Sequence, residues 1–432
     1  MTDPSYWSAQ RCLAALRSRE ISSFELVEAC IARVEERNPS LNAVVAKDYE
    51  RARECARRSD DARLAGRDLG PLHGLPMTVN DARQTAGLVS TSGAPSLRDF
   101  VPDEDAVAVE RALGAGAIIL GKTNLPMFAG DWQTYNAVYG QTNNPWDQNR
   151  TVGGSSGGSA ASLAAGFVPL EIGSDIGGSI RNPAHYCGVY GHKPSHGILP
   201  TRGHIPGPPG QKGEPDLAVV GPMARSPEDL RLVLDVLAGP DLLDAAGLAL
   251  SLPPSRAERL EDFRVGYWFD DPLCPIDTPV RAALEATVEA LGPRVQLVEV
   301  SLPFTLSEIV PHYLRLLLGV IGGDMPAPLR MLTRLLLPYY ALAEELGIPT
   351  DLISKNASRG MHQSHADWAR ANEARAKLRW ACHELFKDID VLLTPQVPTT
   401  AFAHQTGGNH LSRRLVVDGK KRPYMDLSLI HI

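Results

Sequence analysis

The sequence lacks any segment typical of membrane insertion or export. The chain has 432 residues, and none of its apolar runs reaches the ~18 uninterrupted residues that a spanning helix needs. The first residues, Met1-Thr2-Asp3-Pro4, do not have the basic and then apolar pattern of a signal peptide. We therefore predict a cytoplasmic protein with no membrane span.

The sequence also has no excess of basic charge. Its formal net charge is −7, and its isoelectric point is near 6.0. A protein that binds nucleic acid through the phosphate backbone needs a basic surface. The composition therefore argues against nucleic acid as the main partner.

Cysteine is scarce, and its spacing fits neither a disulfide framework nor a metal site. The six cysteines predict reduced, mostly buried thiols; they are Cys12, Cys30, Cys55, Cys187, Cys274 and Cys382. Two histidine pairs, His192 with His196 and His362 with His365, resemble metal spacings but lack the acidic residue of a His-Glu-x-x-His motif. We therefore expect no metal site.

Glycine and serine, by contrast, are concentrated in two clusters. Residues 153–159 read Gly-Gly-Ser-Ser-Gly-Gly-Ser, and residues 173–183 read Gly-Ser-Asp-Ile-Gly-Gly-Ser-Ile-Arg-Asn-Pro. Such clusters are most often flexible linkers. Here a largely apolar segment, 168–172, separates them, and the second cluster carries Asp175 and Arg181, which favours close backbone packing instead.

A serine that follows two glycines at the start of a helix has its hydroxyl beside free backbone N–H groups. Acyl transfer requires this combination of a nucleophilic oxygen and a preformed oxyanion hole. The two clusters therefore predict a serine-dependent acyl-transfer site.

These segments, read through Ala184, resemble the amidase signature family, and the resemblance extends from about Ser22 to Pro398. It implies an α/β amidase-signature fold with a mixed, twisted central sheet and helices on both faces. It also implies an amidase that hydrolyses a small linear carboxamide to carboxylate plus ammonia or amine, without a cofactor.

The resemblance also implies a role for individual residues. Ser179 would be the nucleophile, and Ser155 would relay its proton from a position held by a cis peptide bond after Gly154. The N–H groups of Ile176, Gly177, Gly178 and Ser179 would hold the oxyanion, and Asp175 and Arg181 would brace that loop. The substrate-binding residues would be Ile176, Gly177, Gly178 and Gly154.

One position departs from the family pattern. The family's proton acceptor is a lysine in a Gly-x-Pro-x-x-Val-Lys-Asp segment, which corresponds here to residues 74–81, with Asn80 at the lysine position. Asparagine can hydrogen-bond Ser155 but cannot carry the proton. Loss of one member of such a unit typically costs about 10⁴–10⁶ in turnover. Asn80 has three competing explanations: a deliberate substitution, a natural inactive paralogue, or a sequence error.

Two other functions are compatible with the same residues. One is the A subunit of a tRNA-dependent amidotransferase, which hydrolyses glutamine inside a complex. The other is a non-catalytic amide-binding protein, which Asn80 favours.

A P-loop pattern at residues 116–123 is a chance match. Its four variable positions, 117–120, are apolar and predict a buried strand instead of a phosphate loop, and Pro126 lies where the following helix would begin.

Several elements can be predicted from local signals. Ser22 and Glu25 form a capping box that opens a helix, which Asn38-Pro39 should end. A short buried strand, 75–79, delivers residue 80. A β-α-β unit follows later in the chain, over 263–269, 279–291 and 295–300.

The segment 302–346 is apolar and helical. It fits a cap over a substrate pocket, the surface of a homodimer or a buried core, and we favour the core.

We expect one amidase-signature domain over 1–426, truncated because the family continues with at least two further core strands. Residues 427–432 are expected to be a non-native tail.

Overall fold

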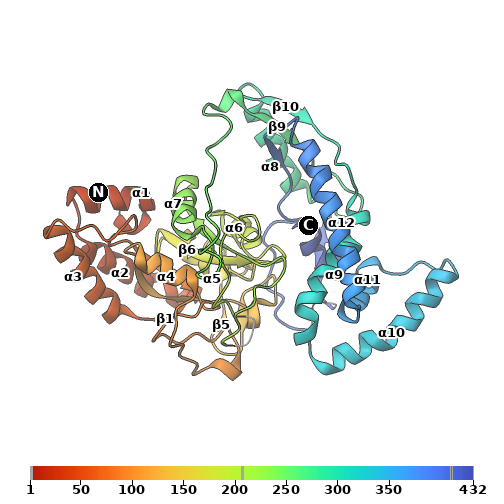
Figure 1. The fold of residues 1–432 in the computed structure, drawn as a ribbon, viewed down its shortest axis with the longest axis horizontal. Coiled ribbons are helices and arrows are strands. Elements are labelled where there is room, and N and C mark those ends of the chain that lie inside the picture. Colours follow the sequence, from red (N-terminus) through yellow and green to blue (C-terminus); the bar gives the residue numbers. More distant parts are fainter. Residues whose placement is uncertain (1–2, 206–208, 409, 411, 432) are drawn as a thin grey trace. The chain divides into compact units, whose positions relative to one another are not determined.

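The computed structural model describes residues 3–205, 209–408, 410 and 412–431 (Figure 1). We predicted one domain over 1–426. The chain is grouped into two compact units, each with its own sheet. The first comprises Met1–Glu214, Ala218–Ser251 and Ala401–Arg413, and the second Pro215–Leu217, Leu252–Thr400 and Arg414–Ile432. Within the described residues, no helix is long and apolar enough to cross a membrane.

A six-stranded mixed sheet forms the centre of the first unit, as predicted. The strand order is β1-β3-β2-β6-β8-β7. β2 runs parallel to β3 and β6, whereas β1, β8 and β7 run antiparallel to their neighbours. The strands are β1 (Val44–Lys47), β2 (Pro76–Asn80), β3 (Ile118–Thr123), β6 (Leu170–Asp175), β7 (Tyr190–Gly191) and β8 (Val219–Ala224).

Helices cover both faces of this sheet, which confirms the predicted fold class. Because successive side chains of a strand alternate between faces, Ile119 packs into one hydrophobic cluster while Ile118 and Leu120 pack into the other. The first cluster includes side chains of α1 (Ala9–Ser18), α4 (Val107–Gly114) and α7 (Pro227–Leu237). The second includes side chains of α2 (Ser23–Leu41), α3 (Tyr49–Leu64), α5 (Gly157–Ala164) and α6 (Arg181–Cys187).

The predicted capping box opens α2. The N–H of Glu25 donates to Ser22 Oγ at 3.1 Å, and the N–H of Ser22 donates to Glu25 Oε2 at 2.8 Å. The predicted end at Asn38-Pro39 is wrong, because α2 continues to Leu41. The Asn38 side chain accepts the N–H groups of residues 43 and 44, so it fixes the exit of the chain without ending the helix.

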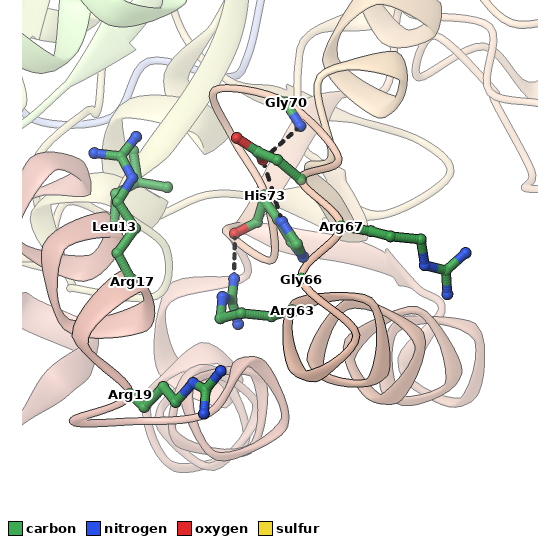
Figure 2. A pocket seen from close by; sticks show the side chains of 9 residues that line it. Leu13, Arg17, Arg19, Arg63, Gly66, Arg67, Gly70 and His73 are labelled. Atoms are coloured by element: carbon green, nitrogen blue, oxygen red, sulfur yellow. Dashed lines mark hydrogen bonds and ion pairs between the residues drawn. The ribbon is translucent and has the colours of Figure 1, made fainter.

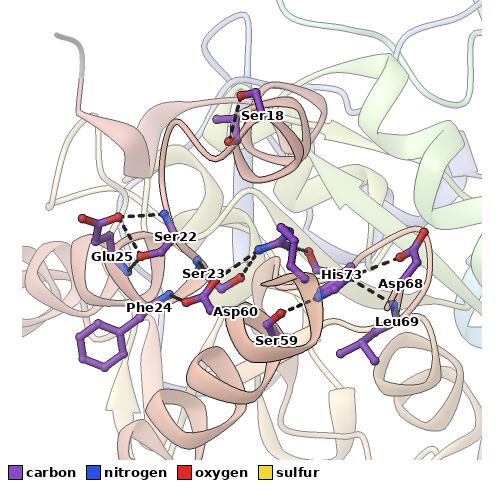
Figure 3. Close-up of polar contacts among 12 residues, drawn as sticks. Ser18, Ser22, Ser23, Phe24, Glu25, Ser59, Asp60, Asp68, Leu69 and His73 are labelled. Atoms are coloured by element: carbon purple, nitrogen blue, oxygen red, sulfur yellow. Dashed lines mark hydrogen bonds and ion pairs between the residues drawn. The ribbon is translucent and has the colours of Figure 1, made fainter. Parts of the chain in front are cut away.

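A carboxylate from α3 also caps α2 (Figure 3). Asp60 accepts the N–H of Ser23 at 2.7 Å and that of Phe24 at 3.0 Å, and it forms an ion pair with Arg63. These free N–H groups at a helix start need an acceptor. Asp60 thereby joins α3 to the start of α2.

The second unit contains the predicted β-α-β unit. Its three-stranded sheet is parallel, in the order β10-β9-β11. The strands are β9 (Arg264–Tyr267), β10 (Gln296–Glu299) and β11 (Val391–Leu393), with α8 (Thr278–Leu291) between the first two. The unit also holds α9 (Leu306–Ile321), α10 (Ala327–Glu345), α11 (Leu352–Met361), α12 (His365–Leu385), β12 (Arg414–Val417) and β13 (Lys420–Pro423).

The apolar segment 302–346 divides between two environments. The core interpretation is confirmed for α9, where Val310 and Leu314 are buried. It is wrong for much of α10, which leaves Met331, Leu335 and Leu342 exposed. The predicted tail starts inside a 3₁₀ helix, Tyr424–His431, and Ile432 lies outside the described residues.

Candidate active site

The candidate site lies at the carboxyl ends of β2 and β6, on the sheet face that α5 covers. Thr78 Oγ1 donates to Glu171 Oε1 at 2.6 Å and lies 3.4 Å from Ser162 Oγ of α5. Asn80 lies two residues beyond Thr78 on the same strand, so its side chain is on the same face. The strand therefore runs to residue 80, whose side chain lies on the face that α5 covers.

The first glycine-serine cluster enters α5 through a closely packed backbone. The peptide bond between Gly154 and Ser155 is cis, where the resemblance places it. A Cβ on Gly154 would lie 2.6 Å from the carbonyl oxygen of Asp131, so this approach requires glycine. Ser155 is fully buried, and its Oγ has no hydrogen-bond partner among the described residues.

A backbone contact joins the two glycine-serine clusters. The N–H of Ser156 donates to the carbonyl oxygen of Ser179 at 3.0 Å. The N–H of Ser174 in turn donates to Ser156 Oγ at 3.3 Å. Ser179 is 7 % exposed. The structure therefore brings the backbone beside Ser155 against the backbone of Ser179.

Asp175 organises the loop that carries Ser179. Its carboxylate accepts the N–H groups of Gly178 at 2.9 Å and Ile180 at 3.1 Å. Its Oδ1 also forms an ion pair with Arg181 Nη2 at 2.9 Å. The same carboxylate therefore binds both the backbone of the loop and the guanidinium that follows it.

The four N–H groups predicted to hold an oxyanion are not equivalent. Those of Ile176, Gly177 and Ser179 donate to no acceptor in the described part of the chain. The N–H of Gly178 already donates to the Asp175 carboxylate, so it is less available to bind an oxyanion than the other three. Trp132 Nε1 donates to the carbonyl oxygen of Gly177 at 2.9 Å and holds this peptide group in place.

Asn80 is buried, with 1 % of its surface exposed. Its Oδ1 accepts the N–H of Ala82 at 3.0 Å, while its Nδ2 has no partner among the described residues. The uncommitted atom at this position is therefore a hydrogen-bond donor. It can donate to a serine oxygen, but it cannot accept a proton.

Lys122, on the neighbouring strand, does not lie on the sheet face that carries Asn80. It pairs in register with Val79, whereas Thr123 pairs with Asn80 and contacts Ser159 of α5, so Lys122 faces the other side of the sheet. Its Nζ donates to Thr85 Oγ1 at 2.9 Å and Ser90 Oγ at 3.1 Å. Burial lowers the pKa of Lys122 to about 8.

Comparison with known proteins identifies the family of the chain. A family model described as Amidase matches residues 25–418. The chain belongs to the amidase signature family.

The amidase-signature relatives include several amidotransferase subunits. The chain is 36 % identical over 412 residues to the A subunit of glutamyl-tRNA(Gln) amidotransferase from Synechococcus sp. (strain CC9605), covering 90 % of this chain and 81 % of the relative. It is 33 % identical over 422 residues to the corresponding protein of Chloroflexus aggregans (strain MD-66 / DSM 9485), covering 93 % and 84 %.

Solved structures of the family give the same fold. A structure described as a vestigial protein complex that reveals the origins of an s-triazine catabolic enzyme superimposes with a TM-score of 0.79 at 30 % identity, covering 98 % of this chain and 88 % of that one. A bacterial aryl acylamidase of the amidase signature family gives 0.78 at 25 % identity, covering 99 % and 87 %.

A basic hollow lies at the other end of β2 (Figure 2). It has a volume of about 350 Å³ and is lined by Leu13, Arg17, Arg19, Arg63, Gly66, Arg67, Asp68, Gly70 and His73. His73 precedes β2, whereas Asn80 ends it. The hollow is therefore not part of the candidate amidase-signature site.

Arg83, three residues after Asn80, is a buried residue near the candidate site that no sequence motif predicts. Its side chain is 1 % exposed, and its Nη2 donates to the carbonyl oxygen of Gly173 at 2.8 Å. The one signal in the sequence is an arginine close to the position where the family's lysine is missing.

Proposed function

We propose that the chain cleaves a carboxamide through an acyl-enzyme on Ser179. The Ser179 oxygen bonds to the amide carbon, and its proton passes to Ser155 and on to the departing nitrogen. The carbon–nitrogen bond then breaks and releases ammonia or an amine. Water attacks the resulting ester, releases the carboxylate and returns a proton to Ser179.

One observation carries this proposal. Ser179 lies within a loop whose N–H groups at Ile176, Gly177 and Ser179 have no protein acceptor among the described residues. Donors arranged in this way stabilise negative charge on the carbonyl oxygen as it develops. Ser155 is buried with an unpartnered hydroxyl on the adjoining segment.

The relatives favour glutamine as the amide. The amidotransferase A subunits named above are 33–36 % identical over most of both chains. On this proposal the chain hydrolyses glutamine within a complex that acts on tRNA, and the partner subunits make most of the contacts with tRNA, because this chain has a net charge of −7. A free-standing enzyme for small aryl amides is the second candidate, because the bacterial aryl acylamidase shares the fold over 99 % of this chain.

Asn80 sets the expected rate. Because its free atom is a donor, the proton from Ser155 has no acceptor at this position. We therefore expect the chain to form the acyl-enzyme slowly and to turn over poorly. Stoichiometric amide binding without turnover is the limiting case.

The test is hydrolysis of glutamine and of a simple aryl amide by the chain, by Asn80→Lys and by Ser179→Ala, with purification from a native host to recover partners. We expect Asn80→Lys to exceed the parent and Ser179→Ala to be inactive. Hydrolysis that persists in Ser179→Ala would contradict the proposal. The proposal would also be contradicted if the parent and Asn80→Lys are both folded and neither hydrolyses an amide.

A further inference from the structure

Arg83 is a buried cation with few partners. Its Nη2 makes one hydrogen bond, to the carbonyl oxygen of Gly173, and its Nε has no partner among the described residues. Burying a guanidinium with so few acceptors is costly. Its burial therefore needs an explanation beyond local packing.

The guanidinium lies at the same strand ends as Asn80. The last register pair between β2 and β6 joins Val79 to Ile172, so Asn80 and Gly173 are the next residues across from each other. The N–H of Arg83 donates to the carbonyl oxygen of Asn80 at 2.9 Å and closes a tight turn. The turn thus returns the Arg83 side chain to the end of the strand that carries Asn80.

Titratable groups on three neighbouring segments interact electrostatically with Arg83. Glu171 of β6 favours the charged form of Arg83, whereas the charge of Arg83 disfavours the protonated forms of Lys122 on β3 and of His204, its partner in a β-bridge. Burial lowers the pKa of Arg83 to about 9, so the guanidinium stays charged at pH 7. Burial lowers the pKa of Lys122 and of His204, and the nearby charge of Arg83 lowers both further.

We propose that Arg83 supplies the buried positive charge that position 80 lacks, and that positions 80 and 83 hold one cation between them. The inference rests on the proposed function. Arg83 acts as a positioning residue: its charge favours proton loss from the buried serines without touching the substrate. A lysine at position 80 would place a second cation in the same region of low dielectric constant.

The shared cation is tested by thermal unfolding of Asn80→Lys, Asn80→Met and Asn80→Lys/Arg83→Met. We expect Asn80→Lys to unfold at a lower temperature than the parent, and the double variant to recover most of that loss. Asn80→Met introduces a neutral side chain about as long as lysine, so it should lower the unfolding temperature less than Asn80→Lys does. Equal unfolding temperatures for Asn80→Lys and the double variant would overturn the inference.

The effect on the serines is tested by the rate at which a fluorophosphonate probe labels Ser179. In this reaction the Ser179 oxygen bonds to phosphorus, fluoride leaves and the serine proton passes to solvent. We expect Arg83→Met to label about tenfold more slowly, the equivalent of one pKa unit. Arg83→Lys keeps the charge and should label within about threefold of the parent. Ser179→Ala is the blank.

The two readouts separate this inference from the proposed function. Labelling of Arg83→Met at the parent rate would overturn the role of Arg83 while leaving Ser179 as the nucleophile. Labelling of no variant would overturn the proposed function, and the role given to Arg83 with it. The unfolding temperatures would still decide whether positions 80 and 83 share one cation.

Discussion

The N–H of Ser156 donates to the carbonyl oxygen of Ser179 across 3.0 Å. This hydrogen bond joins two segments that are separated in the sequence by α5 and β6, and it holds the entry to α5 against the loop after β6. Because both segments are glycine-rich, their backbones can approach closely enough to form it. Close backbone packing therefore contributes to the geometry of the candidate site, together with the side-chain contacts of Asp175 and Trp132.

Removing the Asp175 carboxylate should loosen the loop that carries Ser179. Asp175→Ala deprives the backbone N–H groups of Gly178, Ile180 and Arg181 of this acceptor, and the Arg181 guanidinium of its ion-pair partner. We expect a loss of about 3 kcal/mol in the free energy of unfolding, measured in urea. Asp147→Ala is the control, because its ion pair with Arg150 is about half exposed and should change stability far less. Equal losses in the two variants would contradict this account of the loop.

Removing the Asp60 carboxylate should weaken the start of α2 (Figure 3). Asp60→Ala deprives the N–H groups of Ser23 and Phe24 of their acceptor. We expect a loss of about 1–2 kcal/mol, the usual value for a helix N-cap. Asp61→Ala, next to it and exposed, should change stability by less than about 0.5 kcal/mol. Chemical denaturation of Asp60→Ala and Asp61→Ala measures both free energies of unfolding. A loss for Asp61→Ala as large as that for Asp60→Ala would refute the capping role of Asp60.

Glu171 should make the stability of the chain depend on pH. Burial raises its pKa from 4.5 to about 7. Between pH 4.5 and pH 7 the Glu171 carboxyl has lost its proton in the unfolded chain but keeps it in the folded chain. The stabilisation that Glu171 adds to the free energy of unfolding is therefore complete below pH 4.5, and it is lost as the pH rises through about 7. The loss corresponds to about 3 kcal/mol.

Glu171→Gln removes this titration. The free energy of unfolding is measured against pH for the parent and for the variant. The value for the variant minus that for the parent should rise by about 3 kcal/mol between pH 4.5 and pH 7.5, because only the parent loses stability over this range. A difference that stays constant over this range would show that Glu171 keeps an ordinary pKa in the folded chain.

Local chemistry made much of this fold predictable. The capping box at Ser22 and Glu25 places the start of α2, because it satisfies N–H groups that no other part of the helix can reach. The β-α-β unit of the second sheet follows from its apolar pattern. The cis bond after Gly154 was expected on the strength of the resemblance, and it is present.

Other features depend on contacts that no local pattern encodes. The N–H of Gly178 is bonded to Asp175, which the spacing of the glycines does not reveal. The burial of Arg83 depends on where the turn after β2 directs its side chain. The apolar residues of α10 have the same helical pattern as a core helix but are exposed, because burial is decided by what packs against them.

The central claim is that Ser179 is the nucleophile of an amide-cleaving site, and acylation tests it most directly. With Asn80 in place, the acyl-enzyme should be hydrolysed slowly, so an activated aryl ester should leave one acyl group on the chain. We predict that peptide mass spectrometry finds this group on Ser179, and that Ser179→Ala carries none. Acylation at another residue, or none at Ser179 in either the parent or Asn80→Lys, would contradict the account.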